Sequence, residues 1–177
     1  MAYSFNKASN FSLPMIFTSM NPTWDALFNR VSAFGWNKKI VTFHNESLLD
    51  VFQTKDLIYL TADTDNVCMK LDPSKYYIIG CLLDHNSKKG VTRDFALKNN
   101  IRMERLPISE HIKMEGRQVL TINHVAEILV RVGNGLSWGE ALVQTIPQRK
   151  NPILITKQEN TQKIEEQSGV FKLCEIQ

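Results

Sequence analysis

The sequence has few of the features that mark specialised classes of protein. It has three cysteines, Cys68, Cys81 and Cys174, with no C-x-x-C spacing, which argues against a disulfide scaffold or a zinc knuckle and favours a reducing compartment. The longest near-continuous apolar run, Tyr76 to Leu83, is far below the roughly 20 residues that a membrane span needs. The formal net charge is only +3, which permits nucleic-acid binding without demanding it. We expect one domain with its own core and no membrane segment.

The usual signatures of nucleotide, metal and serine chemistry are also missing. No G-x-G-x-x-G follows a predicted strand and no P-loop motif occurs, because Gly133 and Gly135 follow a predicted helix and are typical of its C-terminal end. No G-x-S-x-G elbow is present either. The histidines are scattered without ligand spacing: His44, His85, His111 and His124. These absences argue against a Rossmann dinucleotide site, a metal centre and a serine hydrolase.

Short apolar runs alternate with amphipathic or helix-capped stretches, the pattern of βα units around a mostly parallel sheet. The apolar runs predict strands at 15–18, 40–43, 57–60, 76–83 and 102–106. Capping residues predict helices that begin after Asn21-Pro22, at Thr92, at Thr121 and at the Ser137–Glu140 capping box. The sequence thus divides into a poorly ordered N-terminus at 1–13, one α/β domain at 14–150 and a loosely held, polar tail at 151–177.

The strongest candidate site follows the fourth predicted strand. Asp84 stands at its carboxyl end and is followed by polar residues, two lysines and Gly90, and ligands of open α/β sheets bind at such ends. Spacing alone also allows a helix cap or a surface-loop acid. From Asp84 to Arg117 there are eight Lys or Arg and five Asp or Glu. A positive face beside a lone carboxylate fits a phosphate-bearing substrate, although solvated helix faces look similar.

Nine short segments, taken in order, carry a further pattern. They are Asp56-Leu-Ile-Tyr-Leu-Thr-Ala-Asp63, Tyr77-Ile-Ile-Gly80, Leu83-Asp84-His-Asn86, Arg105-Leu-Pro-Ile108, Met114-Glu-Gly-Arg117, Val119-Leu-Thr121, Asn123-His-Val125, Glu127-Ile-Leu129 and Ile146-Pro-Gln-Arg-Lys150. In order and spacing they resemble the eukaryotic and archaeal tRNA methyltransferases that modify N1 of the purine at the ninth nucleotide. The resemblance covers roughly 14–150. It implies the SPOUT methyltransferase fold, an α/β fold with a mostly parallel sheet flanked by helices and a C-terminal trefoil knot, a rare exception to unknotted topology.

The resemblance implies S-adenosylmethionine as cofactor, held largely by main-chain groups of three loops. The matching positions are Leu60, Thr61, Cys81, His85, Asn86, Ser87, Lys88, Lys89, Thr92, Leu106, Leu120, Thr121 and Ile122. We expect no metal, because the sequence has no ligand cluster and methyl transfer from a sulfonium needs no Lewis acid. The family's presumed general base matches Asp84. Guanine N1 carries a proton, so methyl transfer needs a group that accepts this proton as the new bond forms.

The resemblance also implies tRNA as partner, with the target base turned out of the folded RNA toward the pocket. The candidate phosphate or base contacts are Lys88, Lys89, Arg93, Arg105 and Arg117. Cys81 departs from the family, which often has a second glycine there, and could narrow the methionine end of the pocket. Gln118 stands where a Lys or Arg is common, and the long basic N-terminal extension of the family is absent.

Two classes of function compete. The chain is either a monomeric methyltransferase acting on guanine, with adenine as a second target, or a tRNA-binding, partner-dependent subunit of a mitochondrial tRNA-processing complex. The stretch from Gly35 to Leu60 and the Ile-Pro-Gln-Arg-Lys segment are closer to the nuclear and cytosolic branch. They favour the stand-alone enzyme, located in the nucleus or cytoplasm, with a mitochondrial location as the alternative. A flavodoxin-like binding module would be favoured only if the motif matches were accidental.

Overall fold

The computed structural model describes residues 14–20, 41–80, 90–116, 118 and 120–155. Its centre is a parallel sheet of strands β4 (Tyr76–Ile79), β3 (Leu57–Leu60) and β5 (Arg102–Glu104), in that spatial order. Residues 57–59 of the middle strand are buried, as expected for a parallel strand covered on both faces. In the register of the sheet, Leu60 lies opposite both Ile79 and Glu104. The three strands therefore end at the same edge.

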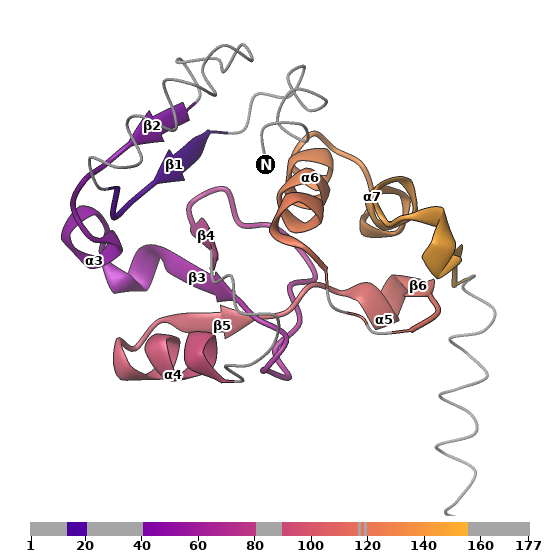
Figure 1. Cartoon of the computed structure of the whole chain (residues 1–177), viewed down its shortest axis with the longest axis horizontal. Helices are drawn as coiled ribbons and strands as arrows, with labels where there is room; N and C mark the ends of the chain where they lie inside the picture. The colour runs from indigo at the N-terminus through magenta and orange to yellow at the C-terminus, as the bar shows by residue number, and fades with distance from the viewer. Residues whose placement is uncertain (1–13, 21–40, 81–89, 117, 119, 156–177) are drawn as a thin grey trace, which may run out of the picture.

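Side chains of β3 alternate between two hydrophobic clusters, one on each face of the sheet. Leu57 and Tyr59 pack with Ala96 and Ile101, next to helix α4 (Val91–Lys98). Leu60 packs on the other side, against the cluster formed mainly by helices α5 (Ile108–His111), α6 (Ile122–Gly133) and α7 (Trp138–Thr145). In Figure 1, α4 runs along β5, and α6 lies beside β4. Helix α7 follows α6 in the sequence and packs against it. The sheet is thus covered by helices on both faces.

The remaining elements are short. Strands β1 (Met15–Phe17) and β2 (Val41–Phe43) pair in parallel, and the rings of Phe17 and Phe43 stack with centroids 5.3 Å apart. Between β2 and β3 lie helix α3 (Leu48–Val51) and the 3₁₀ turn η2 (Thr54–Asp56). A second 3₁₀ turn, η3 (Gln148–Lys150), follows α7. No helix within the described ranges is long and apolar enough to cross a membrane.

Most predicted elements are confirmed where the structure describes them. Strand β3 has the predicted bounds, and β1, β2 and β5 differ from prediction by one or two residues. Helix α7 begins at the predicted capping box, in which the Ser137 hydroxyl accepts a hydrogen bond from the Glu140 N–H at 3.3 Å. The helix predicted after Asn21-Pro22 and the end of the fourth strand at 81–83 lie outside the described residues.

Helix α4 starts earlier than the sequence predicts. The expected cap was Thr92, but Gly90 occupies the N-cap position with φ +81°, and Thr92 lies within the first turn. A positive φ strains residues that have a Cβ, so glycine is the residue suited to this entry into the helix. At α6, Thr121 is the N-cap as predicted, but its hydroxyl bonds to side chains in the first turn and not to a backbone N–H.

The packed body extends past the predicted boundary at Lys150. Strand β7 (Ile153–Leu154) pairs antiparallel with β6 (Ile112–Lys113), and the N–H of Ile155 donates to the carbonyl of His111 at 2.9 Å. Leu154 also packs closely on α7, since a Cβ on Gly139 would lie 2.6 Å from Leu154 Cδ2. Residues 151–155, which the sequence assigns to the tail, therefore belong to the folded domain. Residues 1–13 and 156–177 lie outside the described part of the chain.

Candidate cofactor and tRNA site

The described segments that lead into the predicted cofactor loops at Leu60 and Leu106 leave the central sheet at its carboxyl edge, where β4 also ends. Leu60 ends β3, Gly80 follows β4, and Leu106 comes two residues after the end of β5. Because Leu60 is in register with both Ile79 and Glu104, these three chain segments leave the sheet side by side. This is the edge at which open α/β sheets bind their ligands.

Thr61 and Thr92 are brought together from two different segments. The Thr61 N–H donates to the carbonyl of Glu104 at 3.0 Å, which continues the sheet by one residue. The Thr61 hydroxyl lies 3.3 Å from the Thr92 hydroxyl, so the two share a hydrogen bond. It also accepts a hydrogen bond from the N–H of Asp63 at 3.2 Å. Two predicted cofactor residues thus form one polar cluster at the strand ends.

Gly80, directly after β4, packs closely against Tyr59 and Thr92. A Cβ at this position would lie 2.6 Å from the hydroxyl oxygen of Tyr59 and 3.4 Å from Cγ2 of Thr92. The first distance is shorter than any van der Waals contact, so a side chain at Gly80 would displace the buried Tyr59 ring. The close packing of the end of β4 on Tyr59 therefore requires glycine at this position.

The loop after β5 is held by backbone hydrogen bonds to the segment that follows β3. The Arg105 N–H donates to the carbonyl of Asn66 at 2.8 Å, and the Cys68 N–H donates to the carbonyl of Arg105 at 2.9 Å. Val67 and Arg105 form a parallel bridge. Leu106, the next residue, packs against the larger hydrophobic cluster. The backbone path into the Leu106 loop is therefore fixed.

Arg105 forms an ion pair with Glu110 of the same chain. Its two terminal guanidinium nitrogens donate to the two carboxylate oxygens of Glu110 at 3.1 and 2.6 Å. These hydrogen bonds raise the pKa of Arg105 above its usual value. Burial alone would raise the pKa of Glu110, but the hydrogen bonds and the charge of Arg105 bring it below the usual value. Both groups are therefore charged at neutral pH.

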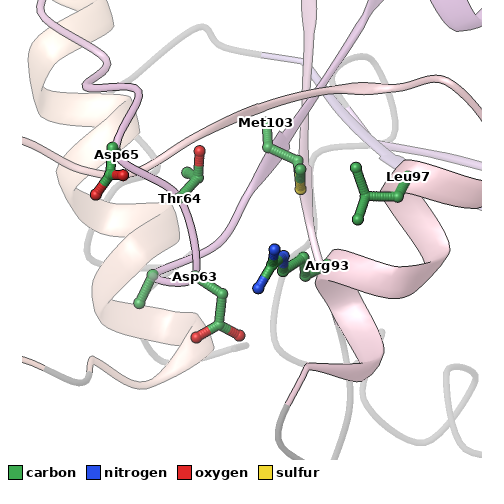
Figure 2. Close-up of a pocket in the computed structure, with 7 residues that line it drawn as sticks. Asp63, Thr64, Asp65, Arg93, Leu97 and Met103 are labelled. Atoms are coloured by element: carbon green, nitrogen blue, oxygen red, sulfur yellow. The ribbon is translucent and has the colours of Figure 1, made fainter.

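Arg93 stands in contrast to Arg105. Its side chain is exposed and lines a pocket of about 470 Å³ between α4 and the segment after β3. Figure 2 shows its guanidinium directed into this pocket, with Asp63 and Thr64 on the facing segment. Within the described part of the chain, Arg93 forms no hydrogen bond or ion pair. Of the two candidate RNA contacts that the structure describes, Arg105 is bound to Glu110, and Arg93 is the one without a described partner.

The last predicted cofactor segment leads into α6. Leu120 packs against the larger hydrophobic cluster, and Thr121 is exposed at the helix N-cap. The Thr121 hydroxyl lies 2.9 Å from Nδ1 of His124. Burial lowers the pKa of His124, the Glu127 charge opposes this shift, and the charges of Lys150 and Arg149 add to it.

Sequence reasoning missed three residues that shape this site. Tyr59 looked like an ordinary core residue, and nothing in the sequence showed that its hydroxyl would face Gly80. Glu110 follows Arg105 by five residues, a spacing that matches neither helix nor strand periodicity. Glu104 is buried and pairs with the exposed Arg102 at 2.6 Å. Beside it, burial and the neighbouring Glu104 raise the pKa of the Cys68 thiol to about 12.

Part of the predicted site lies outside the described residues. This applies to Asp84, Arg117 and the cofactor positions Cys81, His85, Asn86, Ser87, Lys88 and Lys89. Their assignments stay predictions. In the part of the chain that the structure does describe, no three His, Cys, Asp or Glu side chains are grouped as they would be around a metal ion.

Parallel strands covered by helices on both faces, with polar loops gathered at one edge, define a ligand-binding α/β domain. The chain belongs to the family described as tRNA (guanine(9)-N(1))-methyltransferase TRM10/TRM10A, whose family model matches residues 1–151. The fold is the SPOUT-class α/β fold. Its knot stays a prediction, because residues 81–89, 117 and 119 lie outside the described ranges.

Similar proteins agree with this placement. The tRNA methyltransferase 10 homolog A of Xenopus tropicalis is 41% identical over 124 residues, which are 70% of this chain and 37% of that protein. The tRNA (guanine(9)-N1)-methyltransferase of Eremothecium gossypii is 37% identical over 153 residues, which are 84% of this chain and 50% of that protein. The chain thus spans little more than a third of the frog protein. The crystal structure of full-length spTrm10 in complex with SAH matches with a TM-score of 0.70 and 28% identity, covering 82% of this chain and 80% of that one.

Proposed function

We propose that this protein transfers a methyl group from S-adenosylmethionine to N1 of guanine at the ninth nucleotide of tRNA, with adenine as a second target. The observation that carries the proposal is the gathering of Leu60, Thr61, Thr92 and Leu106 at one edge of the parallel sheet. Each of these residues was assigned to the cofactor by the resemblance of the sequence to the family, and they come from three segments of the chain. The names of the relatives and the SAH in the similar crystal structure support the same reaction.

The described residues fit such a cofactor. The loops offer main-chain groups and the hydroxyls of Thr61 and Thr92, which can hydrogen-bond to an adenosine and an amino-acid group. Leu60 and Leu106 supply apolar surface beside them. When bound, the cofactor supplies an electrophilic methyl group on a sulfonium centre, whose transfer requires no metal.

A residue of the chain has to accept the proton on guanine N1. As the bond from N1 to the methyl carbon forms and the bond from sulfur to that carbon breaks, the N1 proton needs an acceptor. Asp84 is our proposed acceptor, because it follows β4 in the sequence, and β4 ends at the edge where the segments of Leu60 and Leu106 leave the sheet. Adenine N1 has a free lone pair and requires no acceptor, which is why both purines are compatible with one site.

The remaining parts of the proposal concern partners and location. We propose that the chain acts as a monomer on tRNA, and that it works in the nucleus or cytoplasm. Arg93, Lys88, Lys89 and Arg117 are the proposed cationic contacts to the RNA. In the sequence, Lys88, Lys89 and Arg93 follow β4, and Arg117 follows β6.

Two measurements test the function. The first is primer extension on tRNA from cells with and without the protein, where loss of the stop at the ninth nucleotide is the expected result. The second is single-turnover methylation by the purified chain of two tRNA transcripts that differ only in G or A at that nucleotide, with a pyrimidine transcript as control. Methylation of the pyrimidine transcript would contradict the proposed N1 chemistry. A chain that binds tRNA and methylates neither purine would support the partner-dependent subunit.

A further inference from the structure

The Arg105–Glu110 ion pair spans the loop that contains Leu106. The two hydrogen bonds run in parallel between guanidinium and carboxylate, the geometry that gives such pairs the most strength and directionality. Both side chains are 28% exposed. At this degree of burial the pair is better shielded from water and salt than an ordinary surface ion pair.

The residues between the two partners explain the unusual spacing. Pro107 is fully buried at the N-cap of α5, and Ile108 begins that helix. The chain therefore turns at Leu106 and Pro107, and the turn brings Glu110 in the first turn of α5 back beside Arg105. The N–H of Ile108 also donates to the carbonyl of Leu106 at 2.9 Å.

The same loop is fixed from its other side. The backbone of Arg105 is hydrogen-bonded to Asn66 and Cys68, in the segment that follows Thr61. The side chain of Arg105 holds α5, and its backbone holds the segment after β3. One residue thus joins two of the segments to which the cofactor is assigned.

Engagement with Glu110 also makes Arg105 a poor ligand for RNA. Two of its five N–H donors already bind the carboxylate of Glu110, whose charge also repels a phosphate, so Arg105 attracts RNA less than an unpaired arginine would. Arg93 carries no such restriction within the described ranges, and it points into an open pocket (Figure 2).

We propose that Arg105 and Glu110 are a positioning pair for the cofactor loop at Leu106, and that of the two candidate arginines in the described ranges Arg93, not Arg105, is available to RNA. This inference rests on the proposed function. A loop already held in its binding conformation loses less conformational freedom when the cofactor binds, and this preserves affinity. Breaking the pair loosens the loop and weakens cofactor binding while the RNA surface stays the same.

The test compares Arg105→Ala, Glu110→Gln, the double variant and Arg93→Ala. Titration with SAH should show Kd raised about 3- to 10-fold in either single variant of the pair, and no further in the double variant, because the partners act as one unit. The KM for S-adenosylmethionine should rise while kcat at saturating cofactor stays near the wild-type value. The affinity for tRNA and its dependence on salt should not change.

Arg93→Ala is the matched control, since it removes the same kind of side chain from the same region. It should weaken tRNA binding and reduce the steepness of the salt dependence, with SAH affinity unchanged. The exchange Arg105→Glu with Glu110→Arg should recover part of the SAH affinity. Such recovery would not follow from a general loss of stability.

Three outcomes would overturn the inference. One is Arg105→Ala reducing the salt dependence of tRNA binding while Glu110→Gln leaves SAH affinity unchanged. Another is tighter tRNA binding by Glu110→Gln, as expected if that change frees Arg105 for RNA. The third is unchanged SAH affinity in all variants of the pair while the wild type binds SAH. If the wild type binds no SAH at all, the proposed function fails together with this inference.

Discussion

The hydroxyl oxygen of Tyr59 lies 2.6 Å from the point that a Cβ on Gly80 would occupy. Tyr59 is 8% exposed and belongs to the cluster formed with α4, so its ring has no open space to enter. The contact joins the middle strand of the sheet to the exit of β4. The packing at the end of β4 therefore depends on the fit between these two residues.

Gly80→Ala should destabilise the protein by about 1 to 3 kcal/mol, the usual cost of forcing extra volume into a packed site. It should also weaken SAH binding, because the strained strand end leads into a cofactor loop. Combining it with Tyr59→Phe, which removes the clashing oxygen, should recover part of both losses. Urea denaturation and SAH titration measure the two effects.

Gly135→Ala is the control for Gly80→Ala. This glycine has φ +97° and no atom near its would-be Cβ, so the substitution strains the backbone by about 1 to 2 kcal/mol without a clash. SAH affinity should stay at the wild-type value. Equal SAH affinity in Gly80→Ala and wild type would show that the strand exit does not shape the cofactor site.

Cys68 should make the protein less stable at alkaline pH. Burial, helped by the nearby Glu104, raises the pKa of its thiol from the ordinary 9.0 to about 12. Below pH 9 the thiol is neutral in both the folded and the unfolded chain, so it adds no pH dependence. Above pH 9 the unfolded chain loses this proton and the folded chain keeps it. The free energy of unfolding therefore falls by up to about 1.4 kcal/mol per pH unit between the two pKa values.

Cys68→Ala isolates this effect in urea denaturation at pH 8 to 10. The variant is less stable overall, but its loss of stability between pH 9 and 10 should be smaller than in the wild type. Tyr77 is the comparison residue, because burial raises its pKa from 10.0 to about 12. With the measurements extended to pH 11, Tyr77→Phe should change the slope mainly above pH 10, with a smaller effect below it because the Tyr77 hydroxyl interacts with the Cys68 thiol. The same slope in wild type and Cys68→Ala would mean that the thiol ionises readily in the folded protein.

Asp84→Asn should slow the methylation of guanine far more than that of adenine. An amide cannot accept the N1 proton of guanine, and loss of a general base costs roughly 10² to 10⁴ in rate. At adenine, Asp84 could only stabilise the developing positive charge, a smaller and salt-sensitive effect. Single-turnover rates on transcripts with G or A at the ninth nucleotide provide the comparison, with SAH affinity measured on the same variant. A near wild-type rate on guanine would show that Asp84 has only a structural role.

Cofactor binding should not depend on a metal ion. The described residues hold no cluster of metal-ligating side chains, and transfer from a sulfonium centre needs no Lewis acid. Calorimetric titration with SAH in the presence and absence of a chelator should give the same Kd. Loss of binding with the chelator would point to ligands among the residues outside the described ranges.

The sequence was most informative where local signals were strong. The four apolar residues of β3 predicted both ends of this strand, and the Ser137–Glu140 box predicted the start of α7, because a strand and a cap depend mainly on neighbouring residues. Helix α4 showed the limit of this reasoning. Thr92 is a good capping residue by type, but the positive φ of Gly90 determines where the helix starts.

The contacts of the site depend on chain folding over longer distances. The resemblance assigned Leu60, Thr61, Thr92 and Leu106 to the cofactor, but no local pattern could show that Thr61 meets Thr92. The Arg105–Glu110 pair forms only because the chain turns at a buried proline. Strand β7 has just two residues, both exposed, and is defined by its pairing with β6. Such elements leave no periodicity in the sequence.

The pairing of β6 with β7 sets an order for synthesis on the ribosome. Strand β6 emerges before all of α6 and α7, whereas its partner emerges after both of these helices. During that interval β6 presents unpaired backbone groups, and Gly139 is not yet covered by Leu154. An unpaired strand edge invites wrong partners, and domains generally acquire their structure as whole units. Co-translational folding therefore cannot complete the domain until Ile155 has left the exit tunnel.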